Sequence, residues 1–572
     1  MKRISAVLLV ALLCASAQAA DGDEFTRSQS YPDPFAERGR PAGPALLPGT
    51  VQLTPAEIDR LILPRAGAIQ TFPSIDRFTG NEDDPLEFRR VKLFADGARI
   101  RVLHDGRSSE QLRPVRQYYL ASNASTGIGL AVHPDTGAVT GYVTRGGDRL
   151  KIEGDFVSQL EFVPIEEAEE GSSACGNGDQ DLSLGSPTVE ASPLAMSVSA
   201  AESGNLITYQ AVVAVDTDSE WLAGFGNDGD EAMEWITNLF LAMNVFYERD
   251  VETQLLIGDV TLRIGSDPYT VSGDTYAKLN EFGEVWMETM DGVDRQFATL
   301  FSGRNISSNS FSGIAWINQF CDYGRWVNNG TAVAGSYSYN AIGSNRTPGN
   351  TAHFVGHELG HNMGSPHTHC YSQPVDQCYS GETYNGSPCF SGTPACPADG
   401  SGTVMSYCHN LGGCQTLSEF HPTVQARLES RLASQLVAGC IIPYTETSPL
   451  PEFQSTPAPG TSLEFGDQPV GATSAPETIQ VQNGGAADLT LLCSLSGSGQ
   501  GAFAIENCLP LVGSLLSGGI EISCSPAAPS SYQATLTLLT NDLDEPTVQY
   551  TLRCDGIDPP PEEMIFQTSF EN

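Results

Sequence analysis

Alternating hydrophobic and polar positions dominate both ends of the chain. Between residues 51 and 164, short alternating runs such as residues 99–103 are separated by Asp-Gly and Gly-Gly pairs. Such runs between turn residues are typical of β-strands. The alternation returns over residues 461–556, where turn clusters recur about every ten residues, a spacing typical of β-sandwiches. The pattern predicts a β-rich unit towards each end of the chain.

Residues 205–442 combine both kinds of pattern. Residues 207–215 and 311–317 alternate like strands. Three other segments carry hydrophobic residues at steps of three or four, which predicts helices. The predicted helices cover residues 228–249, 276–300 and 351–362. Strands alternating with helices predict an α/β domain.

The other segments predict a leader, linkers and a tail. Residues 1–20 have two basic residues, a short apolar run and a small-residue site, which is typical of a signal peptide cleaved after Ala19 or Ala20. A lipid anchor at Cys14 is disfavoured because the bulky Leu13 precedes it. The remaining predicted segments are an N-terminal region at 21–204 with its core at 51–164 and a linker at 165–204, a second linker at 443–460, and a tail at 557–572.

Composition narrows the classes of function. The 572 residues include 29 Lys and Arg against 69 Asp and Glu, a net charge of −40. This balance disfavours nucleic-acid binding and docking on anionic membranes. No later stretch approaches the roughly 18 apolar residues of a membrane helix, so we expect no membrane insertion. Fourteen cysteines indicate an oxidising compartment, in agreement with secretion.

Seven of the nine histidines fall between residues 353 and 421. His357 and His361 are four residues apart, so on a helix they share one face and can both reach one metal ion. Gly364 allows a turn that brings His367 round as a third ligand. Three protein ligands leave zinc an open position for water. Glu358 is then placed to take a proton from that water.

Residues 357–367 have the pattern H-E-x-x-H-x-x-G-x-x-H, which resembles the signature of metzincin zinc metallopeptidases. Within that group, residues 205–442 are similar to the reprolysin (adamalysin, ADAM-like) family, on a divergent, bacterial branch. The resemblance implies one catalytic Zn²⁺ ion and metalloendopeptidase activity on proteins or peptides. The family resemblance gives no evidence for a Ca²⁺ site, so the question of calcium binding stays open. The implied fold is an α/β metzincin catalytic domain between a β-rich propeptide and a C-terminal β-sandwich.

Two further segments match the resemblance, and two positions depart from it. Met405 resembles the Met-turn residue that packs beneath the metal site, and residues 311–317 resemble the edge strand that pairs with a peptide substrate. Adamalysins have Asp where this chain has Thr368. Tyr407 follows the astacin and serralysin pattern, in which the tyrosine is an extra zinc ligand or binds the transition state. A packed aromatic ring is the alternative for Tyr407.

Apart from Cys14 in the predicted signal peptide, the cysteines divide into eight in the α/β domain, four in the C-terminal unit, and Cys175 in the linker. The resemblance implies a disulfide between Cys321 and Cys440. Cys175 is followed by glycine, as in the cysteine switch of metzincin propeptides. Its thiolate would take the open position on zinc and keep a zymogen latent. An ordinary disulfide or a free thiol is the alternative, and the N-terminal region is then a binding domain unrelated to latency.

The remaining features receive non-catalytic interpretations. Four histidines are interpreted as packed, supporting or surface residues rather than ligands: His353, His369, His409 and His421. Residues 461–556 resemble an immunoglobulin-like domain of the ASH or choice-of-anchor type, which binds a surface or substrate or serves as a spacer. Two alternatives to the endopeptidase stay open: a noncatalytic adhesion or matrix-binding protein on a metzincin-like fold, and a zinc hydrolase acting on a nonpeptide bond.

Overall fold

The computed structural model describes residues 45–444 and 451–558, apart from short internal gaps and most of the first linker. The gaps are residues 63–69, 105–106, 112, 115, 124, 134–135, 157, 166–173, 176–206, 308–309, 486–487, 514–515 and 543–544. The predicted signal peptide, most of the linker at 165–204 and the tail after residue 558 therefore lie outside the described residues. Among the helices that are described, none has the length and apolarity needed to cross a membrane.

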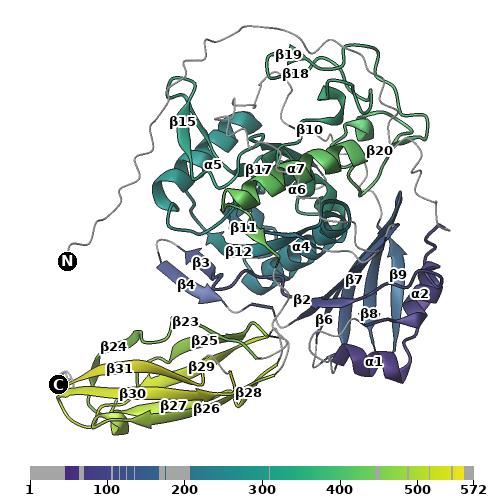
Figure 1. Cartoon of the computed structure of the whole chain (residues 1–572). Coiled ribbons are helices and arrows are strands. Elements are labelled where there is room, and N and C mark those ends of the chain that lie inside the picture. Colours follow the sequence, from purple (N-terminus) through teal and green to yellow (C-terminus); the bar gives the residue numbers. More distant parts are fainter. Residues whose placement is uncertain are drawn as a thin grey trace, which may run out of the picture. The chain divides into compact units, whose positions relative to one another are not determined.

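The middle region of the chain contains a mixed sheet (the central sheet) with strand order β10-β14-β17-β13-β11-β12-β3-β4 (Figure 1). Strands β11, β12, β13 and β17, together with β3 (Ile100–His104), run parallel to one another, and β14 runs antiparallel to β17. The short strand β22 also pairs with β11. The strands are β11 (Tyr209–Thr217), β12 (Thr253–Ile264), β13 (Phe297–Ser302), β14 (Phe311–Ala315), β17 (Tyr337–Ile342), β10 (Ala174–Cys175) and β22 (Ile442–Pro443).

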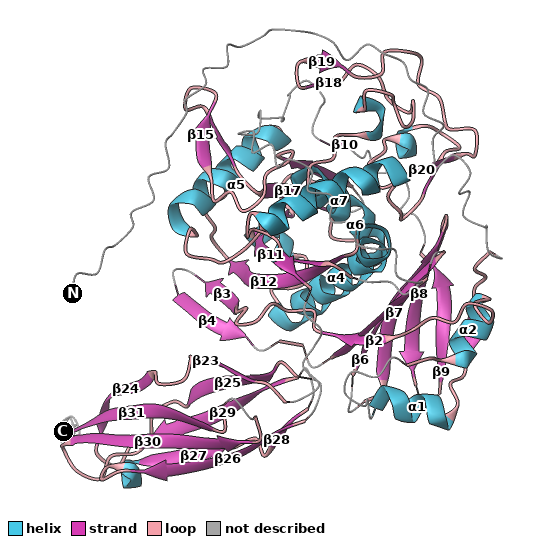
Figure 2. Ribbon diagram, in the orientation of Figure 1, coloured by secondary structure: helices cyan, strands magenta, loops and turns pink. Residues whose placement is uncertain are grey.

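Helices cover both faces of this sheet (Figure 2). Side chains of β11 alternate between the two sides: Val213 and Val215 join the core beneath α4 and α6, whereas Ala214 joins the core beneath α5. This alternation follows from the two-residue period of a strand. The helices are α3 (Ser219–Ala223), α4 (Gly229–Val251), α5 (Thr275–Thr289), α6 (Pro348–Asn362) and α7 (Pro422–Val437).

The helix predicted at 276–300 is too long. Helix α5 ends at Thr289, and β13 begins at Phe297. Phe297 happens to continue the helical spacing, but the Asp291-Gly292 pair interrupts the helix with a turn. The hydrophobic residues after that turn are buried as part of a parallel strand.

Residues 45–165 form a seven-stranded antiparallel sheet, in the order β1-β9-β8-β7-β6-β5-β2. Helices α1 and α2 belong to the core on one face, and α4 packs against β5, β6 and β7 on the other. In β5, Tyr119 faces the first core, whereas Tyr118 and Leu120 face the α4 core. The elements are β1 (Gly49–Val51), α1 (Pro55–Ile62), α2 (Pro73–Thr79), β2 (Arg89–Val91), β5 (Gln117–Ser122), β6 (Thr126–Val132), β7 (Ala138–Arg145), β8 (Asp148–Asp155) and β9 (Gln159–Pro164).

Two strands of the N-terminal region leave its own sheet. β3 (Ile100–His104) pairs in parallel with β12, and β4 (Arg107–Gln111) pairs with β3. In Figure 1 this hairpin lies beside β12 at the edge of the central sheet. The structure thus differs from a self-contained unit at 51–164, because alternation predicts strands but does not identify their partners.

The C-terminal unit is a sandwich of a four-stranded sheet, β23-β25-β29-β27, and a five-stranded sheet, β24-β31-β30-β26-β28. Inward-facing residues such as Val481 and Leu536 share one core. The strands are β23 (Phe453–Thr456), β24 (Ser462–Pro469), β25 (Glu477–Asn483), β26 (Leu489–Ser496), β27 (Phe503–Asn507), β28 (Leu511–Val512), β29 (Ser517–Cys524), β30 (Ser531–Thr540) and β31 (Thr547–Ile557). The prediction of β-rich regions on both sides of the middle region is confirmed.

Short elements complete the middle region. Its two-stranded pairs are β15 (Arg325–Val327) with β16 (Ala332–Ala334), β18 (Thr383–Tyr384) with β19 (Ser387–Pro388), and β20 (Ser401–Gly402) with β21 (Gln415–Thr416). Single turns of 3-10 helix cover Thr368–Cys370 and Cys408–Asn410 there, and Gln500–Ala502 in the sandwich. The segments from 368 to 421 have little regular structure and connect α6 to α7.

Candidate metal centre

Helix α6 presents His357 and His361 on one face. Thr347 caps the helix by accepting a hydrogen bond from the Asn350 N–H, and a proline follows at its first position, where no N–H is needed. The Nδ1 of His357 donates to the Val404 carbonyl at 2.6 Å. The Nδ1 of His361 donates to the Ser365 carbonyl at 2.7 Å. Both rings therefore keep the lone pair on Nε2 for a metal ion.

A glycine turn ends α6 and returns the chain to the site. Gly364 has a φ of +108°, a conformation costly for other residues, and its N–H donates to the His361 carbonyl at 2.8 Å. Beyond this turn, the Nε2 of His367 lies 3.1 Å from the Nε2 of His361. Ligand atoms of His357, His361 and His367 all lie within 4.8 Å of one another. The structure thus brings the three predicted ligands together.

The three histidines form a donor set that suits zinc. Burial lowers the pKa of His357 well below its ordinary value, and burial lowers the pKa of His361 to about 3. Both rings are therefore neutral near pH 7, which is the protonation state that binds metal. Three imidazoles with converging ring nitrogens match the ligands of a catalytic zinc site that keeps one position open.

Glu358 lies between the histidines in sequence and faces strand β14. Its side chain is fully buried. A Cβ atom added at Gly313 of β14 would lie 2.4 Å from the Oε1 of Glu358 and 2.6 Å from the Phe354 ring. Because glycine has no side chain, the edge strand can pass directly beside the Glu358 carboxylate at Gly313.

Met405 and Tyr407 lie on the other side of the histidines. Met405 is fully buried against α6, since a Cβ at Gly360 would meet its sulfur at 2.6 Å. The backbone N–H and the hydroxyl of Thr368 both donate to the Met405 carbonyl, at 3.0 and 3.2 Å. Thr368, the departure from the adamalysin pattern, thus ties the loop after His367 to the Met-turn. The Tyr407 ring lies 4.1 Å from the His367 ring.

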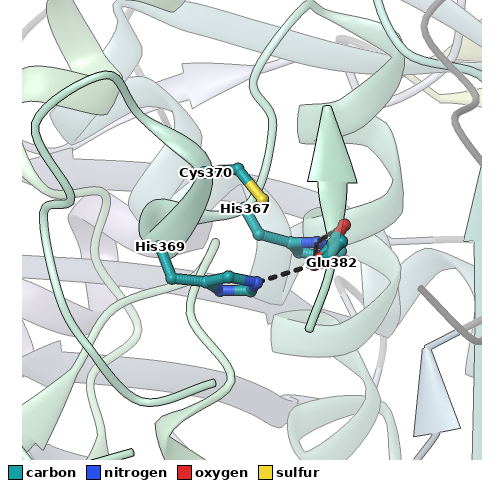
Figure 3. Close-up of side chains that lie close together, drawn as sticks. All are labelled: His367, His369, Cys370 and Glu382. Atoms are coloured by element: carbon teal, nitrogen blue, oxygen red, sulfur yellow. Dashed lines mark hydrogen bonds and ion pairs between the residues drawn. The ribbon is translucent and has the colours of Figure 1, made fainter. Parts of the chain in front are cut away.

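One residue of the site was missed by the sequence analysis. Glu382 accepts hydrogen bonds from the Nδ1 of His367 at 2.8 Å and the Nε2 of His369 at 2.7 Å (Figure 3). Burial alone would raise the pKa of Glu382, but the two histidines beside it hold that pKa well below its usual range. No spacing rule signals this residue, because a long loop separates it from the histidine motif.

The other histidines lie around the three. His369 contacts Glu382, in line with a supporting role. His421 caps α7 by accepting a hydrogen bond from the Thr423 N–H, as expected for a residue just ahead of a helix. Burial lowers the pKa of His353 well below its ordinary value and lowers that of His409 to about 4, so both are neutral near pH 7.

The described cysteines outside β10 form six disulfides. They are Cys321–Cys440, Cys370–Cys389, Cys378–Cys408, Cys396–Cys414, Cys493–Cys508 and Cys524–Cys554. The first is the pair implied by the family resemblance. Cys175 belongs to β10, whose backbone pairs in parallel with β14 so that Cys175 is opposite Gly313. The linker therefore crosses the edge strand beside Glu358.

Residues 208–420 match the family model of Metallo-peptidase family M12, in its Reprolysin_5 group. This region is a metallopeptidase domain of family M12. The match includes the three histidines, Glu358 and the Met-turn, and it confirms the family predicted from the sequence. The M12 domain lies in the middle of the chain between the two β-rich regions. Its family implies zinc dependence and protein or peptide substrates.

Similar solved structures share little sequence with the chain. Metalloproteinase-II from Bacteroides fragilis is 11% identical, with a TM-score of 0.27, over 52% of this chain and 86% of that one. A human ASH/PapD-like domain, from CEP192, is 17% identical, with a TM-score of 0.17, over 21% of this chain and 94% of that one. Neither similarity is close enough to carry an argument. A search of curated proteins gave no match. Four of the six disulfides lie in the middle region and two in the C-terminal sandwich, and together they are consistent with an extracellular protein.

Proposed function

We propose that this protein is a secreted zinc endopeptidase that uses Glu358 as general base and is made as a latent precursor. The observation that carries the proposal is the convergence of three imidazoles beside a buried carboxylate at a sheet edge. A peptide added to β14 would pass Gly313, where that carboxylate lies. Binding by main-chain hydrogen bonds therefore brings a peptide bond to the one place where both groups meet.

The residues have separate roles in this mechanism. Bound zinc supplies Lewis acidity, which polarises the scissile carbonyl and makes water a better nucleophile near neutral pH. His357, His361 and His367 would hold the ion through their Nε2 atoms. Glu358 takes the proton of the attacking water on its carboxylate and passes it to the leaving amine. Tyr407, buried beside His367, would donate from its hydroxyl to the developing oxyanion.

The substitution Glu358→Gln tests this function. It keeps the shape of the side chain but removes the base, so we expect peptide cleavage to fall by roughly 10²–10⁴-fold. Zinc content, measured by metal analysis, should stay at one ion per chain, whereas His361→Ala should lose the ion. Undiminished cleavage by Glu358→Gln would refute the mechanism. A wild-type protein without zinc would instead favour a noncatalytic binding protein.

Latency is supported by the strand β10. It pairs with the edge of β14 that a substrate would need, so linker and substrate cannot occupy that edge together. The proposed thiolate ligand is Cys175, whose backbone pairs opposite Gly313. We expect the Cys175→Ala precursor to cleave peptide slowly before any processing of the linker, because β10 still pairs with the edge, whereas the wild-type precursor stays inactive. N-terminal sequencing of both proteins checks that the linker is still intact.

A further inference from the structure

The Nδ1 atoms of the three candidate ligands donate hydrogen bonds to two different kinds of acceptor. His357 and His361 each donate from Nδ1 to a neutral backbone carbonyl. His367 instead donates to a carboxylate, since both oxygens of Glu382 lie within 2.9 Å of its Nδ1. His367 is also the one ligand outside α6, so no helix fixes the direction of its side chain. The ligand outside the helix thus has a carboxylate as its Nδ1 partner, whereas the two ligands on α6 have carbonyls.

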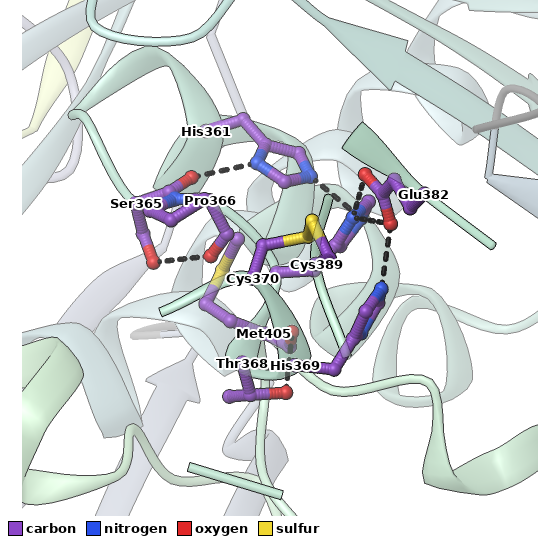
Figure 4. The surroundings of a disulfide bond; sticks show 10 residues. His361, Ser365, Pro366, Thr368, His369, Cys370, Glu382, Cys389 and Met405 are labelled. Carbon is purple, nitrogen blue, oxygen red and sulfur yellow. Dashed lines mark hydrogen bonds and ion pairs between the residues drawn. A yellow bond between two sulfur atoms is a disulfide. The ribbon is translucent and has the colours of Figure 1, made fainter. Parts of the chain in front are cut away.

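Glu382 is itself held firmly in place. Its Oε2 accepts a second hydrogen bond, at 2.7 Å, from the Nε2 of the fully buried His369. The Glu382 carbonyl accepts from the Cys389 N–H at 2.9 Å, and the His369 carbonyl accepts from the Phe390 N–H at 3.0 Å. The disulfide Cys370–Cys389 closes the loop that carries Glu382 (Figure 4). Glu382 is therefore held through its Oε2, through its backbone carbonyl and by the disulfide that closes its loop.

We propose that Glu382 is the positioning residue of the third metal ligand and that His369 holds Glu382 in place. The inference rests on the proposed zinc function and extends it to residues outside the metal-binding motif. A carboxylate hydrogen-bonded to Nδ1 fixes the tautomer that leaves Nε2 free, orients the ring and makes it a stronger ligand. The carboxylate–histidine pair thereby replaces the rigidity that α6 gives the other two ligands.

A second metal site is the alternative explanation for this cluster. Ligand atoms of His367, His369, Cys370 and Glu382 lie within 4.8 Å of one another. The sulfur of Cys370 is bonded to Cys389, so it has no thiolate to offer. The Nδ1 of His367 and the Nε2 of His369 both point at Glu382 at hydrogen-bond distance. The geometry favours a positioning network over a second ion.

Zinc affinity of the full chain tests the proposal, measured by competition with a chromophoric chelator. We expect Glu382→Ala to bind zinc about 10–100-fold more weakly, the usual effect of removing such a partner. Glu382→Gln keeps an acceptor oxygen but loses the charge, so its loss should be smaller. Thr383→Ala is the matched control, because Thr383 is the next residue and its side chain is exposed. It should bind zinc like the wild type.

Two readouts separate positioning from general damage to the fold. The visible spectrum of the Co²⁺-substituted protein should change in Glu382→Ala, and to a lesser degree in His369→Ala, since the ligand geometry changes. At saturating zinc, kcat should fall more than KM rises, because a misplaced ligand acts on the reaction more than on peptide binding. The melting temperature of the metal-free Glu382→Gln protein should match that of the metal-free wild type, which excludes misfolding as the cause.

The outcomes distinguish this inference from the proposed function. If the wild type binds zinc and both Glu382 variants bind it equally tightly with an unchanged Co²⁺ spectrum, the positioning role is refuted while the peptidase stands. If both variants are weakened and Thr383→Ala is not, the role is supported. A wild-type chain that binds no zinc would remove the basis of both.

Discussion

The two edges of the central sheet are both covered by residues from the N-terminal region, but in very different ways. At the β14 edge, beside Glu358, the cover is β10, a pairing of two residues. At the opposite edge, β12 pairs with five residues of β3, and β4 adds a further strand. The β10 pairing is short enough for a peptide to displace it. The β3–β4 hairpin pairs over as many residues as strands β13 and β17 of the domain itself.

The difference extends into the hydrophobic core. Helix α4 of the M12 domain packs against β5, β6 and β7, and a Cβ at Gly129 of β6 would meet Leu241 at 2.9 Å. Tyr118, Leu120 and Tyr142 of the N-terminal sheet belong to the same core as α4. The N-terminal region therefore pairs with one edge of the sheet and completes the hydrophobic core beside the other.

The largest expected effect comes from removing residues 45–165. We expect the M12 domain made without them to be unfolded or aggregated, because α4 and β12 would be left exposed. In the full chain, a single cut at an engineered protease site between residues 176 and 206 should leave both pieces together on gel filtration. Separation of the pieces in native buffer, with the M12 domain still folded, would contradict a lasting role for the β12 edge.

A buried ion pair tests one contact between the N-terminal sheet and helix α4. Arg89 of β2 donates to Glu248 of α4 at 2.7 Å, and the Glu248 side chain is only 3% exposed. Arg89→Ala leaves that carboxylate without its ionic partner, so we expect the free energy of unfolding to fall by about 3–5 kcal/mol. The control is Arg77→Ala, since Arg77 and Glu82 are 71% and 65% exposed and their pair contributes little. Equal losses in denaturant unfolding would show that the contact is not special.

The β14 edge is tested by Gly313→Ala. The added methyl group would overlap Glu358 and the Phe354 ring, so the strand and the carboxylate must move apart. A displacement near 1 Å costs about 10²-fold in rate, which we expect in kcat/KM with zinc content unchanged. Gly412→Ala is the control, because nothing lies near its Cβ position. Wild-type activity in Gly313→Ala would mean that substrate does not pass this point of the strand.

Stability is expected to change by a small step at each pH unit between about 4.5 and 7. Burial raises the pKa of Glu248 to about 7 from its ordinary 4.5, although Arg89 opposes the rise. Between these values the folded chain holds a proton that the unfolded chain has released. The contribution of Glu248 to stability is therefore present below pH 4.5 and lost as the pH rises to about 7, at up to about 1.4 kcal/mol per pH unit. Glu248→Gln should flatten this part of the stability curve, and an unchanged slope would contradict the assignment.

The sequence was informative where chemistry depends on local spacing. The helical four-residue step and Gly364 predicted a cluster of His357, His361 and His367, and the structure has it. It was uninformative where contacts depend on distant segments. Glu382 reaches His367 through a loop closed by a disulfide, and β3 pairs with a strand more than 150 residues away in sequence, as in the pair of Val102 with Leu262. Periodicity describes one segment at a time, so neither partner could be found from it.

The bond between Cys370 and Cys389 has a consequence for where the enzyme can mature. Cysteines pair in oxidising surroundings and stay as free thiols in the reducing interior of a cell. Two bonds, Cys370–Cys389 and Cys378–Cys408, enclose the segment that carries Glu382, and before they form neither link returns it towards His367. If His367 is a zinc ligand, as proposed, its positioning is coupled to an oxidising compartment, and a copy kept in the cytosol would be a poor scavenger of intracellular zinc.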